Sequence, residues 1–529
     1  MTQPNDPVDD RQRDSGTWRL AVAIAASTLA IHLVLAAVVP LFPDETYYWV
    51  WSRHLAPGYF DHPFGIAFLI RIGTLLLGDN ALGVRLGAVL AGFATVLLVL
   101  AMTRRLAGDA GALLASLTMA CLPLAAGGLL LATPDAPLLL ADAMALYALL
   151  RAVSHPPRGA GSLRWWLLAG GALGLCLDSK YTAVLLPLGI LAGLLALPTL
   201  RSRFAEWGPY LGVLVALLLF APVILWNAHH DWISFRFQLT HGLGAPHGSA
   251  LRRELELVGA QAGLASPILF ALMIASCVGA LRREGDHRRA LVSVVALTPF
   301  VFFLISALRR PVEANWPAPA ILAAVVVLGA TGGGEWWRRW RTAGLMLGGA
   351  LVVVTYIHAV VPILPIAASA DPVARSFGFD TLAMRTDDAR RAVVAAAPQG
   401  GRTWIAANRY QDASELAFHL PDQPEVFSLN LSGRANQYDL WPTFFDRAGA
   451  GDQLVLVADD GPDIPRPVEM LTPHFESVHA GALVVLRRGQ GEVERRRIWV
   501  LRGWRCQWPT LVDSFLRTVR RCQAGRPPR

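Results

Sequence analysis

The sequence predicts an all-α domain that crosses a membrane many times, followed by a small α/β domain. The first observation is composition: 54% of the 529 residues are hydrophobic and 16% are charged, with a mean hydropathy of +0.42. Soluble domains carry about a quarter charged residues. The second observation is a series of long apolar runs that ends near residue 367. The third is a change after about residue 369, where short apolar runs alternate with polar residues, proline and glycine.

The apolar runs define the membrane domain. Many approach the roughly 20 residues that a helix needs to cross a bilayer, so we expect about eleven crossings. The first run has Arg11 and Arg13 before it and Arg19 at its start, and it lacks a small-residue cleavage site, which indicates a retained helix behind a cytoplasmic tail, 1–17. The runs are Trp18–Val39, Ala81–Thr103, Ala110–Leu131, Ala136–Leu150, Trp165–Leu177, Thr182–Leu197, Pro209–Trp226, Leu257–Leu281, Ala290–Leu308, Ala318–Ala330 and Ala343–Ala367.

The charges of the connections predict the orientation of these crossings. Every second connection is rich in arginine, as cytoplasmic loops are. The opposite connections carry carboxylates, histidines and aromatic rings, although Arg252, Arg253, Arg309 and Arg310 depart from the rule. The net charge of +8 comes mostly from arginines that flank helices, so we expect no nucleic-acid partner. The five cysteines form no disulfide framework and no metal-binding spacing.

Composition also suggests the domain boundaries. A transmembrane domain is expected at 18–368, with a first outer loop at 41–80. An outer α/β domain is expected at 369–488, with TWIAA, DQLVLVAD and ALVVLRR as short buried strands. The last stretch, 489–529, is basic and aromatic, and is expected to be a membrane-surface helix or an unstructured extension.

The first outer loop contains LFPDETYYWVWSRHLAPGYFDHP, with Asp44 and Glu45 near its start. Two carboxylates at a membrane boundary are costly to desolvate and are often functional. Asp44 also suits the cap of a short helix, and both roles can hold together. The loop's rings fit membrane anchors as well as stacking on a sugar or a polyprenyl chain, which the sequence does not separate. They are Tyr47, Tyr48, Trp49, Trp51 and Tyr59.

Three further outer-face motifs carry ionisable groups. Asp61 and His62 stand before Pro63, where they suit a phosphate, a metal or a neighbouring backbone. Asp135, in TPDAP, is either a helix cap or an acidic wall of a cleft. Lys180, in DSKYT, is the only lysine of the chain. Its ammonium suits a phosphate as a point charge, and the alternative is a lysine that reaches to the interface.

Two later connections complete the set. His229 and His230 lie in WNAHHDW at the end of a crossing, where they are candidate metal ligands or solvent-exposed loop residues. Arg309 and Arg310 begin RRPVEANWP, and two arginines on the outer face suggest an anion such as a lipid phosphate, or a local pair with Glu313. The five connections together place the chemistry for an anionic lipid and a polar acceptor on one face.

These motifs, taken in order, resemble the family 39-like glycosyltransferases of bacteria. These are relatives of the protein O-mannosyltransferases and of the aminoarabinose transferase that modifies lipid A. The resemblance rests on DETYYWVWS, GYFDHP, TPDAP, DSKYT, WNAHHDW and VEANWP, from about residue 41 to 320, and extends to NRYQDASELAFHLP and SGRANQYDLW. It implies a GT-C fold of about 11–13 transmembrane helices with a periplasmic C-terminal domain. It also implies a polyprenyl-phosphate sugar donor and a location in the bacterial inner membrane.

The resemblance also implies roles for residues. Asp44 matches the first-loop acid, the expected general base or acceptor-orienting group, with Glu45 beside it. His62 stands where the aminoarabinose transferases have Lys. The donor phosphate is expected at Lys180, His62, Arg309 and Arg310. A divalent metal at Asp61 and His230 stays open. The substrate cleft is expected to contain Tyr48, Arg53, Tyr59, Asp135, His229, Glu313 and Asn315.

The predicted reaction is inverting transfer of a sugar to a hydroxyl group of an envelope acceptor, which is lipid A or lipopolysaccharide core, another glycan or a protein. Three rivals remain. A lipid-linked sugar transporter or flippase would use charges inside its helices and often repeated halves. A non-enzymatic assembly subunit would need the aromatic rings and not the acids. A polymerase or ligase would join lipid-linked oligosaccharides.

Overall fold

The computed structural model describes residues 15–243, 249–282, 285–396, 401–430, 434–460 and 466–506. The chain forms two compact units. The bundle unit is Met1–Val39 with Leu55–Val360, and the sheet unit is Pro40–His54 with Val361–Arg529. The first outer loop expected at 41–80 is therefore divided between the two units.

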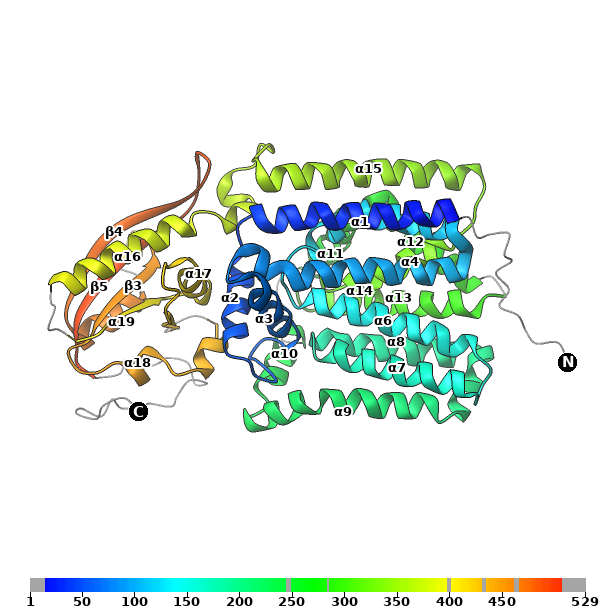
Figure 1. Cartoon of the computed structure of the whole chain (residues 1–529), viewed down its shortest axis with the longest axis horizontal. Helices are drawn as coiled ribbons and strands as arrows, with labels where there is room; N and C mark the ends of the chain where they lie inside the picture. The colour runs from blue at the N-terminus through cyan, green and yellow to red at the C-terminus, as the bar shows by residue number, and fades with distance from the viewer. Residues whose placement is uncertain are drawn as a thin grey trace. The chain divides into compact units, whose positions relative to one another are not determined.

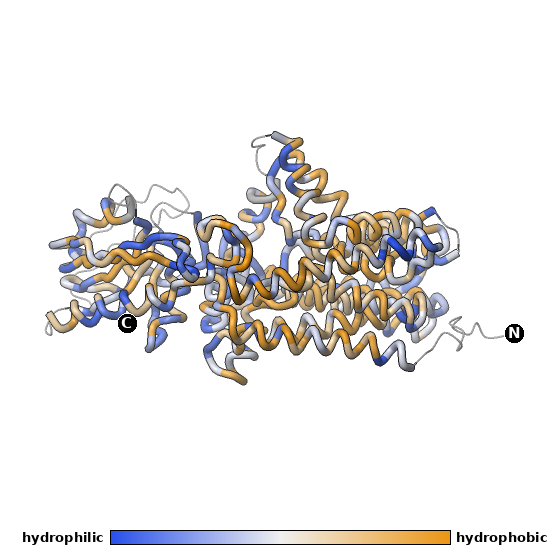
Figure 2. Tube along the Cα trace, turned by 90° about the horizontal axis from the view of Figure 1, so that it is seen from above, coloured by the Kyte–Doolittle hydropathy of each residue, from blue (hydrophilic) through white to orange (hydrophobic). Residues whose placement is uncertain are grey.

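The bundle unit is built from long apolar helices that lie side by side (Figure 1). Figure 2 shows apolar residues along these helices and polar residues gathered towards their ends. The helices are α1 (Ser15–Val38), α3 (Gly65–Leu77), α4 (Ala81–Ala120), α5 (Pro123–Gly128), α6 (Asp135–Ser154), α7 (Ala160–Leu177), η2 (Tyr181–Val184), α8 (Leu185–Ala196), η3 (Pro198–Ala205), α9 (Gly208–His229), α10 (Ile233–Leu243), α11 (Ala250–Ala265), α12 (Pro267–Arg282), α13 (His287–Ala307), α14 (Ala318–Gly329) and α15 (Glu335–Val360).

The protein is a multi-span membrane protein. Among the described residues, 7 helices are long and apolar enough to cross a bilayer, or up to 9 if each sharply bent helix pair is one span. Helices α3 and α14 are apolar but shorter. Helix α4 covers the expected run Ala81–Thr103 and the first half of Ala110–Leu131: its 40 residues would be about 60 Å long, twice a bilayer core. It breaks at Gly108, whose φ of 70° suits glycine.

Helix α14 forms the centre of the bundle. Its residues from Ala320 to Gly329 are all buried, and it packs against α4, α6, α12 and α13. Helices α1, α9 and α15 have the opposite character, because their apolar side chains are largely exposed and suit contact with lipid. The core is therefore a helix surrounded by helices, as the all-α prediction requires.

The sheet unit confirms the predicted small α/β domain. Its five strands have the order β2-β1-β3-β5-β4, with β1 parallel to β2 and β3, and β5 antiparallel to β3 and β4. The elements are α2 (Pro43–Arg53), η4 (Ala368–Ala370), η5 (Val373–Ser376), α16 (Phe379–Ala396), β1 (Thr403–Ala407), α17 (Tyr410–His419), β2 (Phe427–Ser428), η6 (Gln437–Leu440), α18 (Phe444–Arg447), β3 (Gln453–Asp459), α19 (Arg466–Leu471), η7 (Thr472–His474), β4 (Phe475–Arg488) and β5 (Gly491–Trp504).

The prediction of a C-terminal extension from residue 489 is wrong for its first part, which is strand β5. A run of arginines predicts an exposed segment, because arginine is rarely buried. In strand β5, however, Arg496 is buried. Its guanidinium pairs with Asp412 of α17 at 2.8 Å and with Asp459 of β3 at 3.1 Å. Residues 507–529 lie outside the described part of the chain.

Helix α2, the aromatic segment of the first outer loop, packs within the sheet unit against α17. The ring of Tyr47 lies 4.5 Å from that of Tyr410, and Trp49 meets Phe418 edge-on at 5.1 Å. The backbone N–H of Gln437 donates a hydrogen bond of 2.7 Å to the hydroxyl of Tyr47. These rings therefore have a packing role that the sequence did not suggest.

Candidate active site

A buried ion pair and an exposed asparagine join three segments at one end of the bundle unit. The Lys180 amine donates a hydrogen bond of 2.8 Å to Oδ1 of Asp135, and the side chains are 6% and 7% exposed. The Asn315 amide donates to Oδ2 of the same carboxylate at 2.6 Å. Each carboxylate oxygen thus has a polar partner, which a buried carboxylate requires. The cluster brings together three residues that the sequence predicts for the site.

Local structure explains how these side chains meet. Asp135 does not cap α6, because Pro134 holds the position before the helix and Asp135 is its first residue. Lys180 occupies the short extended connection between α7 and η2, with φ −156° and ψ 139°. The start of α6 therefore directs the Asp135 carboxylate towards the Lys180 ammonium, which the short connection between α7 and η2 holds in place.

An apolar pocket of about 500 Å³ is lined by residues that neighbour this cluster in the chain. Tyr181 and Thr182 of the lining directly follow Lys180, and Trp316 directly follows Asn315. Aromatic and aliphatic side chains make up most of the wall, including Phe220, Phe235, Phe302 and Phe303. The bundle unit therefore pairs an apolar hollow with a buried ammonium–carboxylate cluster.

The connection from α13 to α14 runs between two lining residues of this pocket, Ser306 and Trp316. Arg309 and Glu313 are exposed on it, whereas Arg310 is half-buried. The Nε of Arg310 is buried and has no hydrogen-bond partner among the described residues. A buried guanidinium nitrogen without a partner is costly unless an anion supplies one.

Helix α11 holds this connection in place. Arg253 donates to the carbonyl oxygens of Ala307 at 2.8 Å and Leu308 at 2.5 Å, and Gln261 donates to that of Ala314 at 2.8 Å. Arg253 thus satisfies carbonyl groups at the end of α13, where a cation also complements the helix dipole. This structural role explains why Arg253 departs from the expected preference of arginine for cytoplasmic connections.

The turn that contains Tyr59, Asp61 and His62 packs on α10. Ser234 donates to the backbone oxygen of Tyr59 at 2.7 Å, and Gln238 donates to that of Asp61 at 2.8 Å. The Tyr59 hydroxyl accepts the N–H of Ala56 at 3.1 Å, and burial raises the pKa of this phenol to about 12. Gln238 also lines the apolar pocket, so it connects the turn to that pocket.

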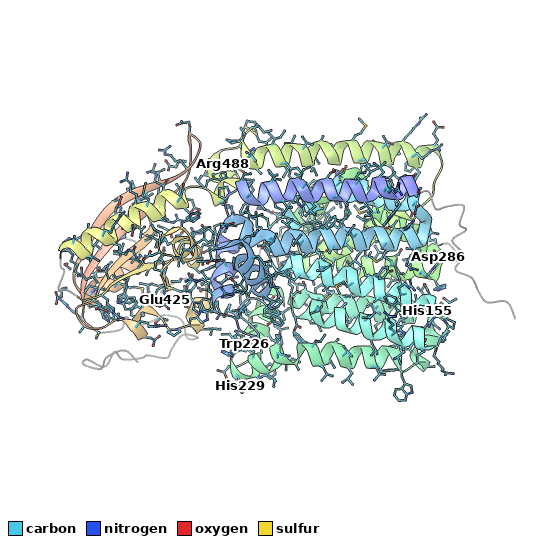
Figure 3. The ribbon with its side chains drawn as sticks, in the orientation of Figure 1. His155, Trp226, His229, Asp286, Glu425 and Arg488 are labelled. Atoms are coloured by element: carbon cyan, nitrogen blue, oxygen red, sulfur yellow. The ribbon has the colours of Figure 1, made fainter. Side chains whose placement is uncertain are left out.

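The two histidines at the end of α9 differ in environment. His229 is exposed, and Figure 3 shows it beside Trp226 at one end of the bundle, opposite the end that carries His155 and Asp286. His230 stacks on Trp226 at 4.0 Å, and its Nδ1 is hydrogen-bonded to the oxygen of Trp226 at 2.8 Å. No group of three or more metal-ligating side chains occurs in the described part of the chain, and the expected metal pair stays a prediction.

The remaining predicted residues belong to α2 in the sheet unit. Asp44 is exposed in the first turn and is not the cap, because the helix begins at Pro43. Glu45 is buried, and its Oε2 accepts the N–H of Phe42 at 3.0 Å. Tyr48 is buried against Trp51 at 4.9 Å. Arg53 donates to the oxygen of Gln423 at 3.0 Å.

Comparison with known proteins supports the resemblance. Residues 61–226 match the dolichyl-phosphate-mannose-protein mannosyltransferase family. A lipid A galacturonosyltransferase of Rhizobium johnstonii is 29% identical over 54% of this chain and 59% of its own length. An undecaprenyl phosphate-aminoarabinose transferase of Pseudomonas aeruginosa is 30% identical over 57% of this chain and 58% of its own. The chain therefore spans about three-fifths of the length of the curated relatives it matches.

The fold has a solved counterpart. The crystal structure of ArnT from Cupriavidus metallidurans in the apo state covers 90% of this chain and 97% of its own, with a TM-score of 0.63 at 16% identity. The chain has the GT-C fold and is a relative of the family 39-like glycosyltransferases. A second ArnT structure, bound to undecaprenyl phosphate, has a TM-score of 0.61 at 17% identity.

The matched family segment includes part of the GT-C candidate site. Asp61, His62, Asp135, Lys180 and Trp226 lie within it. Helix α2 precedes the segment, and the connection from Ser306 to Trp316 follows it. The bundle unit brings together Asp135, Lys180 and Asn315, whereas Asp44, Glu45, Tyr48 and Arg53 belong to the other unit.

Sequence reasoning missed several residues that organise this candidate site. Buried Asn227 donates to the Tyr181 hydroxyl at 3.3 Å and accepts from the N–H of Ser234 at 3.2 Å, so it joins α9, η2 and α10. Gln238 and Phe235 lie in a segment expected to be a loop, which is helix α10. Their spacing of three residues was the available signal, because it places both on one helical face.

Proposed function

We propose that the protein is an inverting glycosyltransferase that moves a sugar from a polyprenyl-phosphate donor to a hydroxyl group of an envelope acceptor. The acceptor is lipid A or lipopolysaccharide core, another glycan or a protein. The observation that carries the proposal is the apolar pocket beside the Lys180–Asp135–Asn315 cluster. The relatives support it, because one is a lipid A galacturonosyltransferase and another is an undecaprenyl phosphate-aminoarabinose transferase.

The donor's two parts suit two parts of the site. The polyprenyl chain occupies the apolar pocket, because burial of apolar surface there is favourable. The phosphate lies at the rim, where Lys180 uses one of its three N–H donors on Asp135 and keeps the others for an anion. Arg310 supplies its buried Nε. His62 and the exposed Arg309 are further candidates for the phosphate.

The reaction is a single displacement at the anomeric carbon. The acceptor oxygen forms a bond to that carbon while the bond between the carbon and the phosphate oxygen breaks. The bonding electrons leave with the polyprenyl phosphate, which gains negative charge. Cations fixed at the phosphate stabilise that charge without moving during the reaction. The attack from the opposite face inverts the anomeric centre.

The acceptor's proton goes to Asp44 in this proposal. Its carboxylate is exposed near the start of α2, whereas the neighbouring Glu45 is buried and accepts the N–H of Phe42. Glu45 therefore positions the helix and Asp44 receives the proton or orients the hydroxyl. The proposed location is the bacterial inner membrane, with the active site and sheet unit on the periplasmic side, because the arginine-rich connections favour the cytoplasm.

The test is transfer by purified protein in proteoliposomes, with an undecaprenyl-phosphate sugar and lipid A as substrates and mass spectrometry of the products. We expect a lipid A product heavier by one sugar residue, and loss of this product in Asp44→Asn with retained folding. Envelope glycolipids from cells with and without the protein identify the sugar and the acceptor class. Movement of the donor across the membrane without covalent transfer would instead establish the flippase alternative.

Donor binding has a separate readout because Lys180 is the only lysine side chain of the chain. Labelling with ε-¹⁵N-lysine places one side-chain NMR signal at this position and keeps all three N–H donors. Undecaprenyl phosphate is expected to shift that signal, and undecaprenol, which lacks the phosphate, is expected to leave it unchanged. Equal shifts by both lipids would contradict a phosphate contact at Lys180.

A further inference from the structure

A second pocket of about 470 Å³ opens at the other end of the bundle unit, where α4, α14 and α15 meet. It lies near the start of α13, because Arg289 on that helix donates to the oxygen of Ala330 in the lining at 2.5 Å. Asp286, directly before α13, marks this end in Figure 3. The pocket is therefore distinct from the proposed donor site.

The floor of this pocket depends on a close approach of two helices. A Cβ atom on Gly111 of α4 would lie 2.9 Å from the oxygen of Gly329 on α14, and one on Gly329 would lie 3.1 Å from the oxygen of Gly111. The two backbones are thus in contact. Small neighbours such as Ala107 and Ala110 leave a hollow between this contact and α15.

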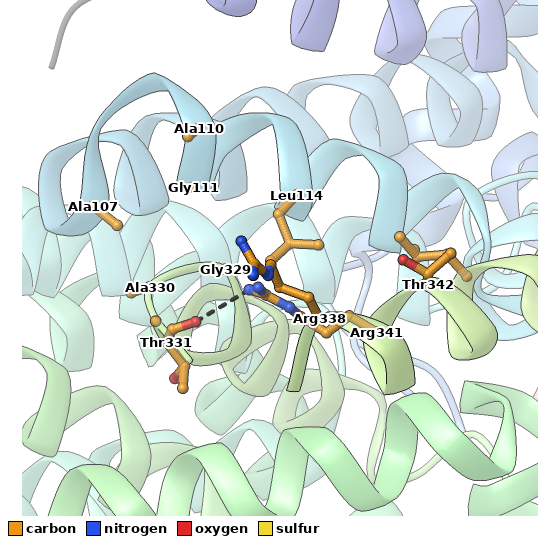
Figure 4. A pocket seen from close by; sticks show the side chains of 12 residues that line it. Ala107, Ala110, Gly111, Leu114, Gly329, Ala330, Thr331, Arg338, Arg341 and Thr342 are labelled. Carbon is orange, nitrogen blue, oxygen red and sulfur yellow. Dashed lines mark hydrogen bonds between the residues drawn. The ribbon is translucent and has the colours of Figure 1, made fainter. Parts of the chain in front are cut away.

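Two arginines of α15, Arg338 and Arg341, reach into the hollow. Figure 4 shows both side chains extending towards Gly329 and Thr331, and Arg341 donates to the oxygen of Thr331 at 3.2 Å. None of the lining residues is Asp or Glu. Within the described part of the chain neither guanidinium has an ion-pair partner, whereas Arg339 on the same helix pairs with Glu335 at 2.5 Å. Two like charges three residues apart repel each other unless an anion joins them.

A neighbouring pocket of about 340 Å³ provides a contrast. It also contains arginines, but Arg104 pairs with Asp109 at 2.5 Å and Arg288 pairs with Asp286 at 3.5 Å. The protein itself neutralises those cations. Arg338 and Arg341, in contrast, have no carboxylate among the residues that line their pocket.

We propose that the pocket of Arg338 and Arg341 binds the phosphate headgroup of an anionic phospholipid. A basic pocket between transmembrane helices suits such headgroups. Trp336 and Trp340 on the same turns of α15 are 63% and 44% exposed, as expected for rings at the headgroup level of a bilayer. The lining residues Leu114 and Leu345 suit the start of an acyl chain. In the proposed orientation this is the cytoplasmic leaflet.

The test is native mass spectrometry of the full-length protein in detergent, titrated with dioleoyl-phosphatidylglycerol or dioleoyl-phosphatidylcholine. We expect one phosphatidylglycerol to bind in preference to phosphatidylcholine, and Arg338→Gln/Arg341→Gln to weaken that binding roughly tenfold or more. Arg339→Gln is the matched control, since it removes a positive charge from the same helix outside the pocket. Equal phosphatidylglycerol binding by the double variant and the control would overturn the proposal.

Two further arms keep the result decisive. Ala110→Phe fills the hollow and keeps both arginines, so it should also weaken lipid binding; unchanged binding would contradict the pocket as the site. Inorganic phosphate should fail to displace the lipid, and displacement at matched concentration would assign the site to a free anion instead. Both measurements are independent of sugar transfer, so the proposed function and this inference can fail separately.

Discussion

Lys180 and Asp135 form a buried ion pair with a distance of 2.8 Å between Nζ and Oδ1, and Asn315 binds the other carboxylate oxygen. Taking two charges out of water is costly, and their attraction repays that cost only with good geometry and further hydrogen bonds. The pair therefore links α6, the α7–η2 connection and the segment before α14 in one arrangement. Its place beside the apolar pocket makes it both a structural link and the proposed phosphate contact.

The first prediction separates these two roles of Lys180. Lys180→Met leaves the Asp135 carboxylate buried without its cation and should cost about 3–5 kcal/mol of stability. Lys180→Met/Asp135→Leu removes both charges and should recover much of that stability, but not sugar transfer. Thermal unfolding and transfer rates of the three proteins measure this. Recovered transfer in the double variant would limit Lys180 to a structural role.

The second prediction concerns Arg310. Arg310→Gln removes the cation with the unpartnered Nε and should lower kcat/KM roughly 100-fold, as loss of one charge-stabilising group does. Arg252→Gln is the control, because Arg252 is exposed and pairs with Glu256 one turn away. Steady-state kinetics with a polyprenyl-phosphate sugar compare them. Matching kinetics in both variants would remove Arg310 from the site.

The third prediction is a pH dependence within the sheet unit. Burial raises the pKa of Glu415 from 4.5 to about 7, and the smaller opposing effects come from His419 and Thr46. Between pH 4.5 and pH 7 the Glu415 carboxyl binds more protons in the folded unit than in the unfolded chain. Its contribution to the free energy of unfolding is therefore greatest below pH 4.5 and is lost as the pH rises through 7. The loss is on the order of 3 kcal/mol.

Glu415→Gln should abolish this loss. Hydrogen–deuterium exchange of α17 in the full-length protein, corrected for intrinsic rates at each pH, reports local stability. The wild type should show weaker protection at pH 8 than at pH 5, and the variant should show similar protection at both. A pH profile that the substitution leaves unchanged would contradict the assignment to Glu415.

The fourth prediction compares two neighbouring arginines of β5. Arg496 is buried among Asp412, Asp459 and Glu494, so Arg496→Met should destabilise the sheet unit by about 3–5 kcal/mol. Arg495 is exposed and paired with Glu492, so Arg495→Met should leave the stability of the sheet unit nearly unchanged. Urea unfolding, monitored by hydrogen–deuterium exchange at β5, measures the stability of both variants. Similar losses would show that position 496 behaves as a surface site.

The sequence by itself determined the class of this protein, because apolar length and the distribution of arginines act locally and can be read along the chain. It also indicated TWIAA and DQLVLVAD as strands, which the structure confirms as β1 and β3. Asp135, Lys180 and Asn315 were each recognised as site candidates from their motifs.

Only the tertiary structure decided which of these residues meet. The Lys180–Asp135–Asn315 cluster joins positions up to 180 residues apart, and no local pattern encodes such a separation. Strand β5 was not predicted for the same reason, because Arg496 is neutralised by Asp412, which lies 84 residues earlier in the chain. It also hid the packing of Tyr47 against Gln437, which places the aromatic segment in the sheet unit. Charges and rings that look solvent-facing in sequence become buried when the fold supplies a distant partner.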